Sequence, residues 1–155
     1  MADTALVGVV VVTHGMLSTE LVNAAEMIVG DLPGFAAVSI GWHDDVDVAR
    51  EEVQRAIDRV RGPNGVLIVT DMFGGTPSNL ALAFLGDGDV EVVTGVNLPM
   101  LIKLVSLRTS TDLQAVAREM REAGRNAIWV ASDLVRANDP ARDGRDARED
   151  REERP

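Results

Sequence analysis

Short aliphatic runs alternate along the chain with stretches in which apolar residues recur every three or four positions. A continuous aliphatic run is typical of a strand that is covered on both faces, as in a parallel sheet. The recurrence at helical spacing predicts amphipathic helices between these strands. The pattern therefore predicts strands at residues 6–12, 35–40, 66–69 and 90–94, with a last short strand at 127–131.

Helices are expected after each of the first four strands. They are predicted at residues 17–28, 46–61, 77–85 and 100–107. Thr111 and Gln114 form a capping-box pattern that predicts a further helix, ending at Gly124. Strands that alternate with helices predict an α/β fold with a doubly wound, mostly parallel sheet and helices on both faces. The expected strand order is 2-1-3-4, with the last strand added at an edge.

The stretch at residues 70–79 places charge beside a turn. Asp71 follows the third strand, and Gly74 and Gly75 supply a turn without Cβ clashes. Thr76 is predicted to cap the next helix, with Pro77 at its first position. The free N–H groups at such a helix start can hold an anion. We therefore expect an anion-binding site at the carboxyl end of this strand.

His14 ends the first strand as Asp71 ends the third. In a sheet of order 2-1-3-4 these two strands are neighbours, at the point where the order reverses and ligands usually bind. The sequence thus predicts a His–Asp pair in one crevice. A carboxylate that accepts one imidazole N–H leaves the other nitrogen free as nucleophile, base or ligand. The alternative is a hydrogen bond that only ties two loops together.

Composition narrows the possible functions. The chain has 155 residues, a formal net charge of -10 and no cysteine. The acidity disfavours nucleic-acid binding, and the lack of cysteine excludes disulfides and Cys-based metal sites. The apolar run at the N-terminus is too short to span a bilayer, so we expect a cytoplasmic protein. Residues 1–136 are predicted to form one domain, and 137–155 a charged, disordered tail.

Two further stretches, at residues 42–45 and 72–73, carry candidate chemistry. His43, with Asp44 and Asp45, predicts a solvated loop, and a metal ligand is the alternative. Trp42 is expected to pack, with a place at the mouth of the site as the alternative. Met72 and Phe73 are expected either to form an apolar rim that receives a partner or to pack onto the next helix.

Three motifs together resemble the mannose-family enzyme IIA (EIIA) domain of the phosphoenolpyruvate-dependent sugar phosphotransferase system, PTS. They are Thr13-His14-Gly15, residues 70–79, and residues 95–101 with the sequence GVNLPML. The motifs have the order and spacing of that family, and the match covers about residues 5–132. The family commonly has Trp in place of Phe73 and Ser in place of Thr76.

The resemblance implies a phosphocarrier without cofactor or metal. His14 would accept a phosphoryl group from phosphorylated HPr and pass it to a histidine of an EIIB protein, with Asp71 as the partner of His14. Backbone groups of Gly74, Gly75 and Thr76 would hold the phosphoryl oxygens. The family also implies a homodimer in which the last strand joins the partner's sheet, and contact with the membrane only through a transporter. A regulatory sensor of phosphorylation and a ligand-binding domain are the alternatives.

Overall fold

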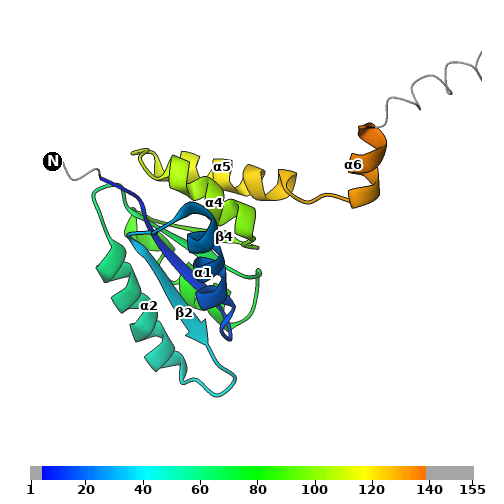
Figure 1. The fold of residues 1–155 in the computed structure, drawn as a ribbon. Coiled ribbons are helices and arrows are strands. Elements are labelled where there is room, and N and C mark those ends of the chain that lie inside the picture. The colour runs from blue at the N-terminus through cyan, green and yellow to red at the C-terminus, as the bar shows by residue number, and fades with distance from the viewer. Residues whose placement is uncertain (1–4, 139–155) are drawn as a thin grey trace, which may run out of the picture. The chain divides into compact units, whose positions relative to one another are not determined.

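The computed structural model describes residues 5–138, so the predicted tail at 137–155 lies outside them except for its first two residues, Ala137 and Asn138. The chain divides into two compact units, Met1–Arg125 and Asn126–Pro155. The first unit contains the sheet and the helices that cover it (Figure 1). None of the helices in residues 5–138 combines the length and the apolar character needed to cross a membrane.

The sheet of the described chain is parallel throughout and has four strands in the order β2-β1-β3-β4. Val12 of β1 pairs with Thr70 of β3, while His14 of β1 pairs with Ile40 of β2. The predicted fold class and strand order are confirmed. The strands are β1 Gly8–His14, β2 Phe35–Ile40, β3 Val66–Thr70 and β4 Val90–Thr94.

Helices cover both faces of this sheet, as the alternating pattern predicted (Figure 1). One face carries α1 Leu17–Val29, α4 Leu98–Leu107 and α5 Leu113–Asn126. The other face carries α2 Val46–Val60 and α3 Thr76–Leu82, with a short 3-10 turn at Leu85–Asp87.

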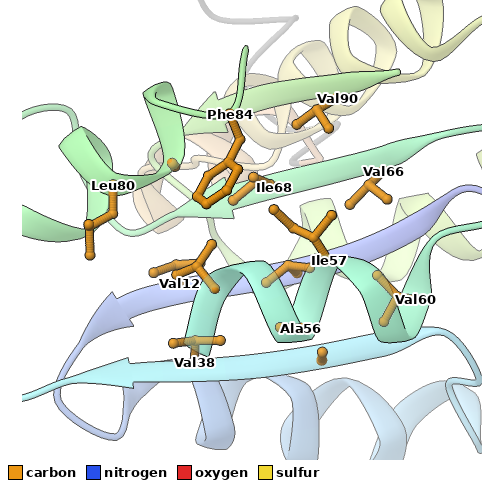
Figure 2. Packing of buried hydrophobic residues seen from close by; sticks show 14 of the residues in the cluster. Val12, Val38, Ala56, Ile57, Val60, Val66, Ile68, Leu80, Phe84 and Val90 are labelled. Atoms are coloured by element: carbon orange, nitrogen blue, oxygen red, sulfur yellow. The ribbon is translucent and has the colours of Figure 1, made fainter. Parts of the chain in front are cut away.

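The core consists of two apolar layers, one on each side of the sheet. Successive residues of β1 alternate between the layers: Val10 and Val12 face α2 and α3, while Val9 and Val11 face the other helices. Figure 2 shows the first layer, in which Ile57 of α2 lies among side chains of the central strands. Because both faces are covered, all five residues of β3 are buried, which explains its continuous aliphatic run.

Two helix starts differ from the sequence prediction. The N-cap of α3 is Gly75, with φ of 81°, and Thr76 is already helical. The α5 helix is capped by Asp112, whose Oδ1 accepts the N–H of Ala115 at 2.9 Å. Thr111 was the wrong cap because Asp112 is an equally good capping residue one position later.

The C-terminal strand predicted at residues 127–131 is absent from the described chain. Residues 127–130 form no regular element, and a helix, α6 Ala131–Ala137, follows them. A strand needs a neighbour for its N–H and C=O groups, and no described strand pairs with this segment. Ile128, Trp129 and Val130 are nevertheless exposed, as apolar side chains without a covering surface.

Candidate active site

His14 and Asp71 lie at the carboxyl ends of neighbouring strands. His14 is the last residue of β1, and Asp71 comes directly after β3. The chain first moves outward from β1 to β2 and then returns across β1 to β3, so the strand order reverses here. Such a reversal opens a crevice past the strand ends. The topology therefore brings the two predicted residues together.

The Asp71 carboxylate holds the His14 ring in one orientation. Its Oδ2 lies 2.8 Å from Nδ1 of His14 and accepts the backbone N–H of His14 at 3.1 Å. Its other oxygen accepts the N–H of Met72 at 3.1 Å. An ionised carboxylate only accepts hydrogen bonds, so Nδ1 carries a proton, and in the neutral imidazole Nε2 keeps its lone pair. Nε2 is then a free nucleophile.

Asp71 stays ionised in this setting. Burial by itself raises the pKa of Asp71, whose side chain is only 13% exposed. The hydrogen bonds from the ring and the backbone of His14, the attraction of that ring and the N–H of Met72 outweigh burial. The pKa of Asp71 therefore lies below its ordinary value, and the carboxylate can stabilise a positive charge on the imidazole.

A concavity of about 370 Å³ opens beside His14. The Nε2 side of the ring faces Gly75, where an added Cβ would lie 3.1 Å from Nε2. The His14 side chain is 52% exposed, so Nε2 is accessible to a second molecule. The walls of the concavity are formed by His14, Gly15, Ile40, Gly41, Trp42, Gly75 and Thr76.

The structure brings only part of the predicted set into this concavity. Gly75 and Thr76 line it, whereas Gly74 does not. Met72 and Phe73 are exposed at the surface, Phe73 to 74%, so neither side chain is buried against the next helix. The expected packing of Trp42 is also wrong, since this side chain is fully exposed and lines the concavity.

His43 lies away from these walls. It lines a separate surface depression with Ser39, Asp44 and Asp45. Within residues 5–138, no three His, Asp or Glu side chains are grouped closely enough to share a metal ion.

A hydroxyl network behind His14 was missed by the sequence analysis. The buried Thr13 accepts the backbone N–H of Ser18 through Oγ1 at 2.7 Å. The Ser18 hydroxyl donates to the carbonyl of Val38 at 3.1 Å and lies 3.1 Å from the Ser39 hydroxyl. These bonds fix the turn that carries His14 and the start of α1 against β2. The signal in the sequence was one hydroxyl residue on each side of the histidine, Thr13 before it and Ser18 after it. A hydroxyl group that is buried needs a hydrogen-bond partner.

We expect Gly75→Ala to slow any reaction of Nε2 by about tenfold or more, because small misplacements at a reacting centre are costly. The new methyl group would lie 3.1 Å from Nε2 and 3.2 Å from Cε1, against the ring and inside the concavity. The φ of 81° adds backbone strain. The measurement is the rate at which His14 is modified when the modifying reagent is present at a saturating concentration.

Gly74→Ala is the matched control for this substitution. Gly74 has a similar φ of 86°, but no atom lies within 4 Å of the added Cβ. It shares the backbone strain without the contact to His14. Equal rates for the two variants would contradict the assigned role of Gly75.

The fold and the site define an open, doubly wound α/β domain that presents one free imidazole nitrogen where its strand order reverses. Residues 8–121 match the mannose-type enzyme IIA family, EIIA-man, described as "PTS system fructose IIA component". The chain belongs to this family. The resemblance of its three motifs is thereby confirmed.

Individual relatives agree with this assignment. The fructose-specific EIIA component of Bacillus subtilis (strain 168) is 27% identical over 146 residues, covering 94% of this chain and 99% of that protein. The mannose-specific EIIAB component of Escherichia coli (strain K12) is 30% identical over 132 residues, covering 79% of this chain but 39% of that longer protein. The chain is thus an EIIA component of the sugar phosphotransferase system.

Solved structures support the same fold. A PTS IIA protein associated with the fucose utilization operon of Streptococcus pneumoniae has a TM-score of 0.75 at 24% identity, covering 84% of this chain and 97% of that one. The mannose/sorbose specific IIA subunit of Enterococcus faecalis has a TM-score of 0.72 at 25% identity, covering 81% and 94%. The sheet and its covering helices are therefore shared with known IIA proteins.

Proposed function

We propose that this protein is a phosphocarrier that accepts a phosphoryl group on Nε2 of His14 from phosphorylated HPr and passes it to a histidine of an EIIB protein. The observation that carries the proposal is the bond between Nδ1 of His14 and Asp71, which leaves Nε2 free beside an open concavity. Membership in the EIIA family supplies the class of donor and acceptor.

The transfer depends mainly on how the reacting groups are positioned and on how the developing charge is stabilised. The Nε2 lone pair attacks phosphorus in line while the bond from phosphorus to the donor's imidazole nitrogen breaks, and the donor nitrogen keeps that electron pair. The proton on Nδ1 stays in its hydrogen bond to Asp71. The ring becomes positive as the new phosphorus–nitrogen bond forms, and the partly buried carboxylate of Asp71 stabilises it. Because the transition state of phosphoryl transfer is loose, positioning and charge stabilisation account for almost all of the catalysis.

The start of α3 is suited to the phosphoryl oxygens. The first N–H groups of a helix have no partner within that helix, and its N-terminus carries partial positive charge. Gly75 and Thr76 stand there and line the concavity beside Nε2. We assign the phosphoryl contacts to the backbone of Gly75 and Thr76 and to the Thr76 hydroxyl, and not to Gly74, which does not line the concavity. Met72 and Phe73 form the apolar rim that meets the partner protein.

The proposal is tested by incubating the full chain with phosphoenolpyruvate, enzyme I and HPr, and then measuring its intact mass. A gain of one phosphoryl group that requires every component supports it. The phosphorylated protein is then mixed with an EIIB protein, and loss of the added mass is followed. A chain that stays unmodified in the complete mixture would refute the proposal.

We further propose that the protein forms a homodimer through residues 127–131. Ile128, Trp129 and Val130 are exposed, and Val130 has an extended backbone. Within the described sheet, the outer edge of β4 has no neighbouring strand. A concavity of about 310 Å³ lies beside that edge, between residues 91–94 and α5. Residues 127–131 of a second copy would pair with the edge of β4. Their apolar side chains would then be covered in the concavity beside that edge.

We expect the double variant Ile128→Asp with Val130→Asp to be monomeric, because it places two charges in the proposed dimer contact. Light scattering of the wild-type protein should give the mass of two chains, and the variant should give the mass of one. Val135→Asp, which charges an equally exposed position on α6, should leave the dimer intact. A double variant that keeps the wild-type mass would contradict this interface.

A further inference from the structure

Trp42 is a large apolar side chain in an unusual place. It follows β2 in the loop before α2, and its side chain is fully exposed. Aromatic side chains contribute most to stability when they are buried, so a fully exposed tryptophan gains nothing for the fold. Trp42 nevertheless forms one wall of the concavity that contains His14. Its position at this wall suggests a role in contacts with another molecule.

The topology places aromatic side chains on both sides of His14. β1 lies between β2 and β3, so the loop after β2 and the loop after β3 flank the histidine. The first loop carries Trp42 and the second carries Phe73, and both side chains are exposed. The His14 concavity opens between Trp42 and the start of α3. Ile40 and three glycines make most of its remaining lining apolar.

Charge around Trp42 indicates the kind of partner. Asp44, Asp45 and Asp47 follow it closely, and all three are exposed. Two of them are fixed by backbone hydrogen bonds: Asp44 accepts the N–H of Gly41, and Asp45 accepts the N–H groups of Asp47 and Val48. No ion pair of the described residues involves these three carboxylates. An exposed aromatic ring beside fixed, unpaired acids fits a basic surface that carries an apolar side chain.

We propose that Trp42 is a docking anchor for the protein that donates the phosphoryl group. An apolar side chain on the donor's face, next to its phosphorylated histidine, enters the concavity between Trp42 and the start of α3, and basic groups around it meet the acidic loop. This inference rests on the proposed phosphocarrier function. The concavity, with a volume of about 370 Å³, leaves room for the donor's apolar side chain and for the phosphoryl group on Nε2. Trp42 positions the donor and takes no part in the chemical step.

The test compares a protein donor with a small one. Phosphorylated HPr reaches His14 by docking, whereas phosphoramidate needs no docking surface. Truncating an interface tryptophan commonly costs a factor of about ten or more in affinity. We therefore expect Trp42→Ala to raise the KM for phosphorylated HPr about tenfold, with the rate from phosphoramidate unchanged. Trp42→Phe should recover most of the loss, and Met27→Ala, which removes another exposed apolar side chain, should behave as wild type.

Fluorescence gives an independent readout. The chain has two tryptophans, so Trp129→Phe leaves Trp42 as the only indole. A fully exposed indole emits at long wavelength, and we expect the emission to shift to the blue when HPr is added. An unshifted emission at saturating HPr would overturn the docking role.

The other outcomes separate this inference from the proposed function. If both donors label the wild-type protein and Trp42→Ala reacts with HPr like wild type, docking through Trp42 is refuted while the phosphocarrier function stands. A loss of rate that is equal with both donors also refutes docking, because Trp42 would then act on His14 itself. If neither donor labels the wild-type protein, the phosphocarrier function fails, and the docking role fails with it.

Discussion

His14→Ala will not be phosphorylated by phosphoenolpyruvate, enzyme I and HPr. The substitution removes the only described imidazole whose Nδ1 is bonded to a carboxylate and whose Nε2 opens into a concavity. A methyl group has no lone pair to attack phosphorus, so the expected effect is complete loss of the added mass. Because the His14 side chain is half exposed, its removal leaves the core intact, and the variant should fold normally.

His43→Ala is the matched control, because it removes the chain's other histidine. His43 is exposed and lines a different surface depression, so this variant should be labelled at the wild-type rate. The label on the wild-type protein should be lost in acid and kept in base, as expected of a phosphorus–nitrogen bond. An acid-stable label on His14→Ala would place the acceptor on a hydroxyl or carboxylate and overturn the phosphocarrier assignment.

The fold and the central pair of the site were predictable because general rules fix them. A strand covered on both faces is predominantly apolar, and β3 shows this in the aliphatic sequence of residues 66–69 and in the burial of all five of its residues. The carboxyl ends of neighbouring parallel strands meet at one edge of the sheet, so residues that end β1 and β3 are brought together. His14 and Asp71 therefore follow from the strand pattern and the order alone.

The features that could not be predicted depend on the exact residue at which a helix begins, or on contacts with other parts of the molecule. Adjacent capping residues at 111 and 112 leave the helix start ambiguous by one position, and the structure uses Asp112. Trp42 stands in a loop, where no periodic pattern tells an exposed side chain from a packed one. The apolar segment at 127–131 satisfies strand propensity, yet a strand forms only where another strand is available to pair with it.

Asp71→Ala is expected to slow phosphorylation of His14 by about 100-fold without abolishing it. The variant keeps the nucleophile but removes the acceptor at 2.8 Å that holds Nδ1, so the ring can rotate and take the other tautomer. It also removes the charge that stabilises the positive ring. Loss of the comparable carboxylate in a hydrolase triad costs about 10⁴-fold, but a phosphocarrier needs no proton transfer in its chemical step, so the loss here should be smaller. Single-turnover rates with phosphorylated HPr measure it.

Asp71→Asn separates orientation from charge. Its amide oxygen can take the place of Oδ2 and accept from Nδ1, but its NH₂ group then faces the N–H of Met72, and the charge is lost. We expect a rate between those of wild type and Asp71→Ala. Asp31→Ala is the control: it removes an exposed carboxylate in the loop between α1 and β2, and its rate should match that of wild type. An unchanged rate for Asp71→Ala would show that the pair only ties two loops together.

The titration of Asp71 tests the same pair without any donor. Its pKa in the folded protein lies below 3.8, the value of an unperturbed aspartate. The carboxylate therefore stabilises the folded state fully above pH 3.8, and this contribution is lost as the pH falls through the lower, folded pKa. In carbon NMR, the Asp71 carboxyl should titrate below that value, and in His14→Ala its pKa should move upward. Since burial alone raises this pKa, a midpoint above 3.8 in the wild-type protein would mean that His14 does not hold the carboxylate in solution.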